Sequence, residues 1–321
     1  MNPTLPTILI SGAGQLGSRY LQGLVKCRLP LRIYVQDIYE ESLDRAEQRW
    51  DEAHGPVSHH TVSFHTSFES LPRQLNVAIV ATTAGVRPQV IGEIADHSAV
   101  QFWVLEKVLA QSEAGLDEIM SSIGNGSSAW VNTPRRMLHW HQQIKSKLDH
   151  GRPMTLKVDG GSWGLACNSI HFLDMFAWWV GETLVEINTE QLDSQWFEAK
   201  RPGNFEVLGT LHAKFSGGSC VSLSARKGEV FYAFELDDGT HTWSIDEDAS
   251  TAKRSDGFDL PGRLPFQSEM STALVESILE NGTCELPTLT ESAEIHRVFI
   301  RSMLEHWKRS VNGCATAVPI T

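Results

Sequence analysis

Short apolar runs alternate with amphipathic segments through the first 128 residues, and this alternation constrains the fold more than any other feature. Apolar runs rich in β-branched residues predict strands, and the segments between them have the spacing of helices. The predicted strands are TILIS (7–11), LRIYV (31–35), TVSFH (61–65), NVAIVA (76–81) and QFWVLE (101–106). Because strands that alternate with helices form βαβ units, this part of the chain predicts an α/β fold with a doubly wound parallel sheet.

The second half of the chain has a different pattern and predicts an α+β domain. A Gly/Ser-rich break, GNGSS (124–128), separates the two halves. After this break the sequence predicts a helix at 169–181, alternating strands between 184 and 246, and amphipathic helices at 267–280 and 291–311. With 321 residues the chain is long enough for two domains, which we expect at 1–128 and 129–321.

The charge balance excludes some classes of partner. The chain has 27 basic and 39 acidic residues, a net charge of -12. This charge would repel a nucleic-acid backbone and an anionic membrane surface. The sequence contains no apolar run of roughly 20 residues, and its N-terminus lacks the pattern of a signal peptide. We therefore expect a cytoplasmic protein that binds neither nucleic acid nor membranes.

A glycine-rich loop, GAGQLG (12–17), follows the first predicted strand and opens a helix. In this context Gly12 permits a tight turn, Gly14 lets a pyrophosphate approach the backbone, and Gly17 lets the helix pack on the strand. Gln15 and Leu16 complete the loop, and the phosphates would lie at the N-terminus of the helix. The pattern predicts a Rossmann dinucleotide-binding domain.

The choice of dinucleotide depends on Asp37, twenty residues beyond Gly17. A carboxylate at the end of the second strand accepts hydrogen bonds from the ribose hydroxyls of adenosine. The residues that follow are IYEE, without an arginine to hold a 2′-phosphate. The sequence therefore predicts NAD rather than NADP. The alternative is an ordinary glycine-rich turn followed by a helix-capping aspartate.

Two further clusters follow predicted strands at the same edge of the sheet. In VATTAG (80–85), Thr82 and Thr83 are candidates to contact the pyrophosphate and the nicotinamide ribose, although an ordinary turn explains either one equally well. In LEKVLA, Glu106 and Lys107 end the fifth strand. Lys107 could stabilise an alkoxide as hydride leaves the carbon. Glu106 is a candidate cofactor-binding residue at the same edge.

The predicted helix at 169–181 carries His171 and Asp174, three residues apart and therefore on a common face. We expect Asn168 or Ser169 to cap this helix. A histidine beside a carboxylate can serve as an acid/base near neutral pH. The alternative is a buried core histidine with a structural aspartate.

Candidates for substrate contacts are less specific. Arg135 and Arg136 could bind an anionic group, although arginines beside a proline are more often part of structural salt bridges. Trp163 could stack on a sugar ring. His139 and His141 are two residues apart and would point to different faces of a helix, so we interpret them as structural and predict no metal site.

These motifs together resemble the Gfo/Idh/MocA family, the group of glucose-fructose oxidoreductase and inositol dehydrogenase. The resemblance covers nearly the whole chain: GAGQLG with Asp37, VAIVATTAG, EKVLA in place of the usual EKP, VNTPRRM, SIHFLD with WWVG after it, and ELPTLTESAEIHR. It implies an N-terminal Rossmann domain and a C-terminal α+β domain with a large open, mostly antiparallel sheet. It also implies a homodimer or homotetramer formed through that sheet. By the same resemblance Lys107 is the catalytic lysine and His171 the catalytic acid/base, converging on one substrate from different domains.

The chain departs from the family pattern at two positions. Val108 replaces the proline of EKP, and Cys167 stands where the family often has an aspartate four residues before the histidine. We count Cys167 among the candidate substrate contacts. A thiol cannot replace the carboxylate of the aspartate, so either His171 depends on Asp174 or the proton relay differs. We expect an NAD-dependent dehydrogenase acting on a secondary alcohol of a sugar, nucleotide sugar or cyclitol. A non-catalytic dinucleotide- or sugar-binding regulatory protein is the alternative, and Cys167 favours it; a structural scaffold would need neither Asp37 nor Lys107.

Overall fold

The computed structural model describes residues 5–54, 59–124, 128–311 and 313–321. The chain forms two compact units. The first contains Met1–Leu109, Gly115–Asn132 and Pro265–Leu289, and the second contains Ala110–Ala114, Thr133–Leu264 and Thr290–Thr321. Of the predicted break at 124–128, residues 125–127 lie outside the described residues.

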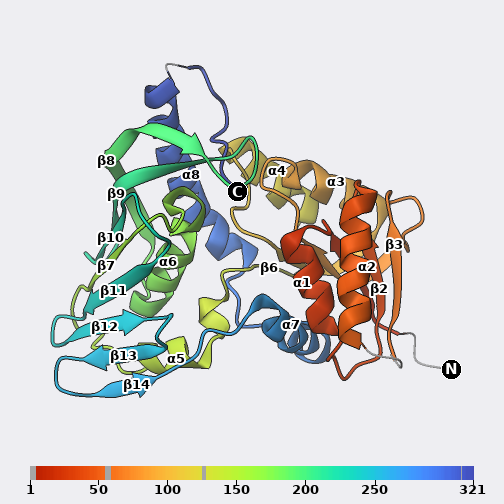
Figure 1. Cartoon of the computed structure of the whole chain (residues 1–321), viewed down its shortest axis with the longest axis horizontal. Helices are drawn as coiled ribbons and strands as arrows, with labels where there is room; N and C mark the ends of the chain where they lie inside the picture. Colours follow the sequence, from red (N-terminus) through yellow and green to blue (C-terminus); the bar gives the residue numbers. More distant parts are fainter. Residues whose placement is uncertain (1–4, 55–58, 125–127, 312) are drawn as a thin grey trace. The chain divides into compact units, whose positions relative to one another are not determined.

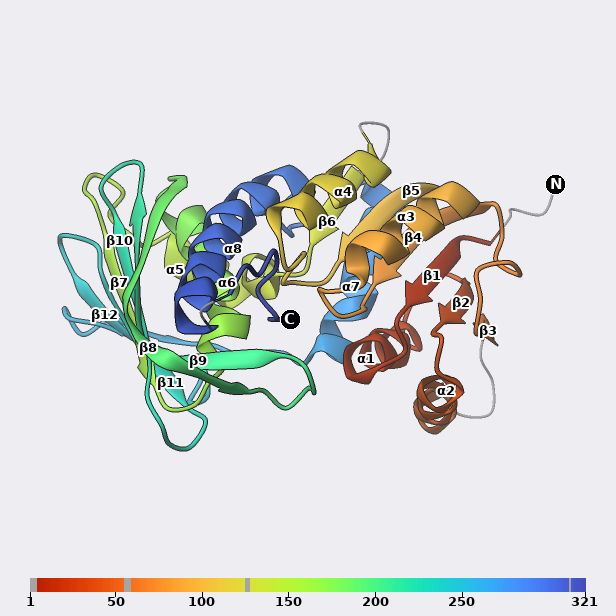
Figure 2. The ribbon, with the colours of Figure 1, turned by 90° about the horizontal axis from the view of Figure 1, so that it is seen from above.

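The first unit is built on a six-stranded parallel sheet in the order β3-β2-β1-β4-β5-β6. The strands are β1 (Thr7–Ser11), β2 (Arg32–Gln36), β3 (Thr61–His65), β4 (Gln74–Val80), β5 (Ala99–Leu105) and β6 (Ser128–Val131). The connecting helices are α1 (Gln15–Leu24), α2 (Glu40–His54), α3 (Arg87–His97) and α4 (Glu113–Ile123). Figure 2 shows α1 and α2 on one face of this sheet and α3 and α4 on the other. The predicted doubly wound parallel sheet is confirmed.

The strand order reverses between β1 and β4, two strands in the middle of the sheet. Ile8, Leu9 and Ile10 of β1 have no exposed surface, and the last four residues of β4 are equally buried. Strands covered on both faces have continuous apolar runs, which explains why their sequences lack alternation. The carboxyl ends of β1 and β4 therefore flank the point where an open α/β sheet binds ligands.

A later segment of the chain, α7 (Gln267–Asn281), completes the first unit by packing on α1. A Cβ at Gly23 would overlap the backbone of Ser268, so the two helices are in close contact. The Thr272 hydroxyl donates to the Gly23 carbonyl at 2.7 Å, and Arg28 forms an ion pair with Glu276 at 2.9 Å. The predicted helix at 267–280 is confirmed, and it belongs to the first unit (Figure 1).

The second unit contains an eight-stranded sheet in the order β14-β13-β12-β11-β7-β10-β9-β8. Only the pair of β7 and β10 is parallel among its described ladders, which confirms the predicted open, mostly antiparallel sheet. The strands are β7 (Thr155–Gly160), β8 (Leu184–Glu198), β9 (Phe205–Phe215), β10 (Cys220–Ala225), β11 (Tyr232–Asp237), β12 (Thr242–Asp246), β13 (Thr251–Arg254) and β14 (Asp259–Pro261). The helical elements are the 3-10 helix η1 (Pro134–Met137), α5 (His139–Lys145), α6 (Leu165–Val180) and α8 (Leu289–Val311).

The two faces of the second sheet differ in character. Helices α5, α6 and α8 lie on one face, as Figure 2 shows, and β7 alternates buried and exposed residues accordingly. The other face carries a polar cross-strand row in which Lys157 pairs in register with Glu235, Glu235 with Ser244, and Ser244 with Lys253. Within the described residues, no helix combines the length and apolar character needed to cross a bilayer.

Candidate functional site

The glycine loop after β1 has the geometry that its sequence predicts. Gly12 has a φ of 92°, and a Cβ there would lie 2.8 Å from the Thr82 backbone nitrogen. A Cβ at Gly17 would overlap the Gly12 carbonyl oxygen. Only glycine fits at either position, because the loop, the helix and the end of β4 approach one another too closely for a side chain.

Gly14 differs from its neighbours in that the space around it is open. A Cβ at Gly14 would meet nothing within 4 Å, and its φ of -62° suits any residue. The loop itself therefore does not require a glycine here, whereas a ligand approaching the backbone would. Gln15 begins α1, and its side-chain oxygen accepts a hydrogen bond at 2.9 Å from Arg49, which also donates to the Ser18 hydroxyl. Arg49 thus anchors α2 to the first turn of α1, while Leu16 is half-buried in that turn.

Asp37 follows β2 and turns its carboxylate back toward the glycine loop. Oδ2 accepts a hydrogen bond from the Ala13 backbone N–H at 2.7 Å, and Oδ1 accepts one from the Tyr39 N–H at 3.0 Å. A carboxylate has about four lone-pair sites, so acceptor capacity remains for ribose hydroxyls. Ile38 and Tyr39 are 70% and 66% exposed. Sequence reasoning missed this apolar surface beside Asp37, which suits the adenine ring of a nucleotide.

The end of β4 provides a polar atom without a partner. The Thr82 hydroxyl oxygen is buried, and it has no hydrogen-bond partner among the residues that the structure describes. Buried hydroxyls are normally hydrogen-bonded. Together with the space at Gly14, this hydroxyl fits a dinucleotide lying across the ends of β1 and β4. Thr83 is half-buried, and its carbonyl accepts from the Arg87 backbone N–H at the start of α3.

Lys107 follows β5, half-buried, and a buried arginine holds the backbone around it. Arg87 is 1% exposed and donates to the carbonyls of Thr82, Val108 and Leu109, the last at 3.1 Å. The two strand ends that carry Thr82 and Lys107 are thus joined through one guanidinium group. The peptide bond between Lys107 and Val108 is cis. Sequence reasoning missed Arg87, and the proline after it marks only the start of a helix.

Glu106 is buried inside the first unit. Its Oε1 accepts from the Tyr20 hydroxyl at 2.7 Å and from the Asn132 amide at 2.6 Å. Burial raises the pKa of Glu106, and those two hydrogen bonds and the charges of Arg87 and Lys107 act in the opposite direction. These contacts favour a role in shaping the end of β5 over a direct contact with cofactor.

In the second unit, α6 carries His171 and begins earlier than the sequence predicts. The expectation that Asn168 or Ser169 caps the helix is wrong, because the N-cap is Gly164. The Glu206 carboxylate accepts from the backbone N–H groups of Ala166 and Cys167 at 2.8 and 3.2 Å. A carboxylate from β9 therefore performs the capping that a local side chain usually performs. His171 is half-buried, one turn beyond Cys167.

Asp174 is 1% exposed, and its carboxylate is hydrogen-bonded by Arg136 of η1 and by Thr133, the residue before η1. Arg136 donates to both of its oxygens, at 2.7 and 3.0 Å, and the Thr133 hydroxyl donates at 2.8 Å. Burial raises the pKa of Asp174, whereas Arg136 lowers it. The pairing of His171 with Asp174 stays a prediction, and the contacts of Asp174 and Arg136 favour a structural role for both.

Arg135 is occupied in the same way by a buried cluster. Its guanidinium donates to both oxygens of Glu247, at 2.8 and 2.6 Å. Tyr232 and His141 contact the same carboxylate at 2.7 and 2.8 Å. Arg135 and His141 hold the pKa of Glu247 well below its usual range, although burial opposes them. These contacts favour a structural role for Arg135 and His141 over substrate or metal binding; His139 is exposed.

Trp163 is a core residue of the second unit. It is 4% exposed, its ring meets the rings of Phe172 and Tyr232 edge to face, and its Nε1 donates to the Ser224 carbonyl at 2.9 Å. A ring with both a satisfied donor and packed faces offers little surface to a sugar. Stacking of Trp163 on a substrate therefore stays a prediction that these contacts do not favour.

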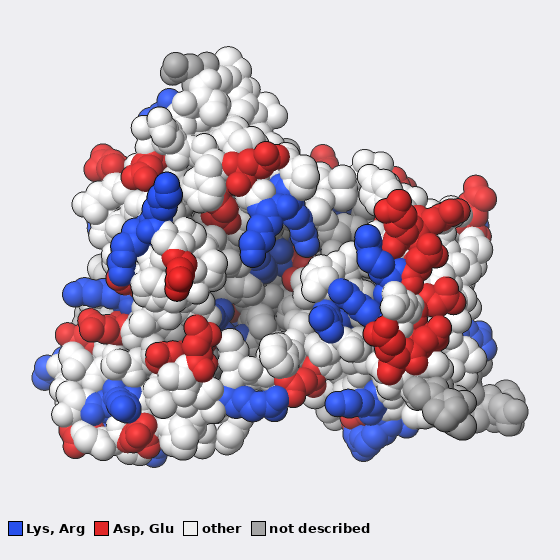
Figure 3. Space-filling model, in the orientation of Figure 1, with Lys and Arg blue, Asp and Glu red and all other residues white. Residues whose placement is uncertain are grey.

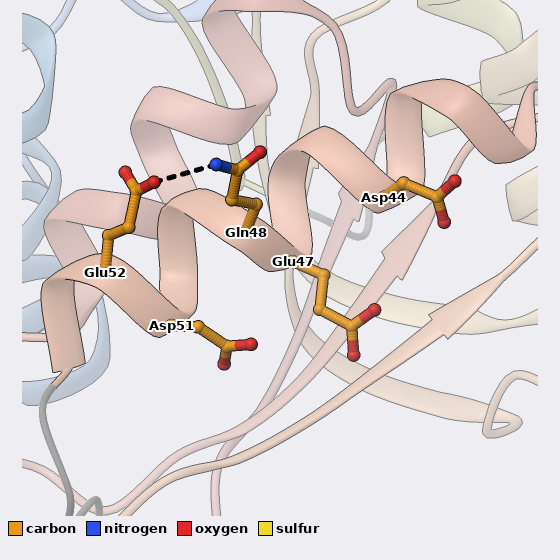
Figure 4. Close-up of a pocket in the computed structure, with 5 residues that line it drawn as sticks. All are labelled: Asp44, Glu47, Gln48, Asp51 and Glu52. Carbon is orange, nitrogen blue, oxygen red and sulfur yellow. Dashed lines mark hydrogen bonds between the residues drawn. The ribbon is translucent and has the colours of Figure 1, made fainter.

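An open hollow of about 530 Å³ lies away from these residues, on the outer face of α2. Figure 4 shows its lining: Asp44, Glu47, Gln48, Asp51 and Glu52. Figure 3 shows acidic side chains gathered over this helix. Four carboxylates would repel the phosphates of a nucleotide, so the hollow is a solvated helix face rather than part of the nucleotide site.

No protein-family model and no curated protein matches the chain. Solved structures do match it in fold. An oxidoreductase from Agrobacterium radiobacter, in complex with NAD+, L-tartaric acid and magnesium, has a TM-score of 0.72 at 13% identity over 96% of this chain and 97% of that chain. A UDP-N-acetylglucosamine 3-dehydrogenase from Acidithiobacillus ferrooxidans has a TM-score of 0.70 at 14% identity, over 94% of this chain and 97% of that chain. The myo-inositol dehydrogenase from Lactobacillus casei, in complex with NAD(H) and myo-inositol, has a TM-score of 0.69 at 13% identity over 95% of both chains.

The fold defines a class: a Rossmann unit joined to a unit with an open antiparallel sheet. It is the fold of the Gfo/Idh/MocA oxidoreductases, as the sequence resemblance implied. The structure brings together the glycine loop, Asp37 and Thr82 in the first unit. The expected approach of Lys107 to His171 joins residues of different units and stays a prediction.

Proposed function

We propose that the protein is an NAD-dependent dehydrogenase that oxidises a secondary alcohol of a sugar, nucleotide sugar or cyclitol. The observation that carries the proposal is the glycine loop, where Gly12 and Gly17 are required by the fold and Gly14 only by a ligand. Asp37 supports NAD over NADP, because its carboxylate would accept from ribose hydroxyls and repel a 2′-phosphate. Solved structures of this fold bind NAD(H) together with myo-inositol or L-tartaric acid, which supports a polyhydroxylated substrate.

The first unit would hold the cofactor and the second the substrate. Gly12, Gly14, Gln15 and Leu16 would receive the pyrophosphate at the start of α1, and Asp37 the adenosine ribose. Thr82 and Thr83 would contact the nicotinamide half from the end of β4. Bound NAD supplies the hydride acceptor for the reaction.

In this proposal two residues of the chain, Lys107 and His171, take part directly in the reaction. The Lys107 ammonium group would donate a hydrogen bond to the substrate oxygen and stabilise negative charge on it as the hydride leaves. An imidazole nitrogen of His171 would accept the hydroxyl proton. Asp174 is already paired with Arg136, so we assign no step to it. The proposal requires that Lys107 and His171 reach the same substrate.

A turnover assay tests the enzyme proposal. Wild type is screened against sugars, nucleotide sugars and cyclitols for NADH formation, and Lys107→Met is compared with Lys26→Met, which alters an exposed lysine of the same unit. We expect Lys107→Met to lower kcat by at least about 100-fold and Lys26→Met to leave it unchanged. Equal turnover in both variants would remove Lys107 from the mechanism.

The second candidate function is a non-catalytic dinucleotide-binding regulatory protein. Cys167 favours it, because a thiol at the start of α6 stands where the family that the sequence resembles often has an aspartate. The same screen separates the two functions. Tight NADH binding without turnover of any substrate in the screen supports the regulatory protein, and turnover excludes it.

A further inference from the structure

A chain of hydrogen bonds at the ends of β5 and β6 terminates in an amide donor. The Tyr20 hydroxyl and Asn132 Nδ2 both donate to Glu106 Oε1. The same Asn132 nitrogen donates to Gln267 Oε1 at 3.0 Å. Gln267 Nε2 is buried and has no hydrogen-bond partner within the described part of the chain.

The orientation of both amides follows from Glu106. Its Oε1 atom receives two donors, the Tyr20 hydroxyl and the Asn132 amide. Asn132 must therefore present its nitrogen to Glu106, since its oxygen would face another acceptor. With that nitrogen also facing Gln267, the Gln267 oxygen must accept. The Gln267 nitrogen is then the donor that lacks an acceptor. Exchanging the oxygen and nitrogen of this amide would place two donors, Asn132 Nδ2 and Gln267 Nε2, against each other.

The position of this donor indicates what it would meet. Asn132 directly follows β6, and Glu106 directly follows β5. In a doubly wound sheet of this order, the half beyond the reversal between β1 and β4 holds the second mononucleotide of a dinucleotide. For NAD that mononucleotide carries the nicotinamide ring and its carboxamide. Gln267 belongs to the same unit as both strand ends.

Two other buried ring nitrogens lack a partner among the described residues, His141 Nδ1 and Trp179 Nε1. Both residues have no exposed surface, and their rings lie 5.6 Å apart in the core of the second unit. A ligand cannot reach them without opening the core. Gln267, in contrast, is a half-buried residue at the first position of α7, where Glu269 fixes the backbone by accepting from the Phe266 N–H at 2.8 Å.

We propose that Gln267 Nε2 donates a hydrogen bond to the carboxamide oxygen of bound nicotinamide and so fixes the ring beside Lys107. This inference rests on the proposed dinucleotide site. A buried amide donor without a partner is unfavourable, and a carbonyl oxygen from a ligand satisfies it. The Glu106–Asn132 pair is then a positioning device, since it determines that a donor rather than an acceptor faces the ligand.

Binding of NADH and of ADP-ribose, measured by calorimetry, tests the proposal. ADP-ribose shares the adenosine, the pyrophosphate and the second ribose with NADH but lacks the nicotinamide. We expect Gln267→Leu to weaken NADH binding about 3- to 10-fold and to leave ADP-ribose binding within about twofold of wild type. Gln89→Leu, the same substitution at an exposed position of α3, should change neither.

Gln267→Glu adds a second, sharper test. It keeps an acceptor for Asn132 but places a carboxylate oxygen where the donor was, so NADH should bind more weakly than to Gln267→Leu, with ADP-ribose less affected. Unchanged NADH binding in Gln267→Leu would overturn the inference, as would an equal loss for both ligands. If wild type binds neither ligand, the proposed function itself fails. This failure is distinct from a failure of the Gln267 proposal, because it is seen in wild type without any variant.

Discussion

Gly14→Ala separates the demands of the fold from the demands of a ligand. A methyl group at this position meets no atom within 4 Å, and the φ of -62° is open to alanine. Two small effects then act on stability: alanine restricts the unfolded chain, and it is a poorer N-cap than glycine. We expect the free energy of unfolding to change by no more than about 1 kcal/mol, measured by urea titration.

The same methyl group should weaken cofactor binding. It extends about 1.5 Å from Cα into the space where a pyrophosphate would meet the backbone. Forcing one methyl group into such a contact costs about 1 to 3 kcal/mol, which raises the Kd for NADH about 5- to 150-fold. Gly92→Ala is the control, since a Cβ there makes only an ordinary contact at 3.7 Å with Ser122. An unchanged Kd in a stable Gly14→Ala protein would refute the cofactor position.

Three further predictions concern Asp37, Asp174 and Glu247. Asp37→Ser removes the charge that opposes a 2′-phosphate, so the ratio of the NADPH Kd to the NADH Kd should fall at least about tenfold. An unchanged ratio in fluorescence titrations would show that Asp37 does not select the cofactor. Asp174→Asn leaves the buried Arg136 guanidinium without its main counter-charge, so the free energy of unfolding, measured by urea titration, should fall by about 3 kcal/mol. A fall below about 1 kcal/mol would mean that the ion pair is effectively solvated. The folded-state pKa of Glu247 lies below its unfolded value, so its contribution to stability is complete above the unfolded pKa of about 4.3 and falls as the pH drops below that value. Glu247→Gln should therefore reduce the loss of unfolding free energy at acid pH. A loss as steep as in wild type would contradict the ionised, paired state of Glu247.

The features predictable from the sequence were those carried by local patterns. Five predicted strands and the helix at 267–280 are present because apolar periodicity records which residues are buried. The glycine loop was predictable because each glycine meets a local steric requirement. Periodicity does not record against what a helix is buried, so nothing in the sequence of α7 assigns it to the first unit.

Partners far apart in the sequence were beyond local patterns. Arg135 and Glu247 are 112 residues apart, and Glu206 caps a helix 40 residues before it. Their pairing depends on the order of strands in the second sheet, which no single motif encodes. For the same reason Asp174 suggested a partner for His171, three residues away, whereas the fold supplies it with Arg136, 38 residues away.

The contacts of polar groups divide the candidate residues between scaffold and chemistry. In the second unit, the polar side chains first suggested for substrate binding are engaged by protein: Arg135 by Glu247, and Arg136 by Asp174. In the first unit, the buried Thr82 hydroxyl at the end of β4 and the buried Gln267 amide at the start of α7 lack protein partners within the described residues, whereas the unpartnered nitrogens of His141 and Trp179 lie in the core of the second unit. A folded chain keeps such atoms at a cost in stability, and a ligand can offset that cost. The first unit therefore has the more complete set of groups for a ligand, and, if the proposed substrate binds beside His171, its selectivity would come from side chains other than the two paired arginines.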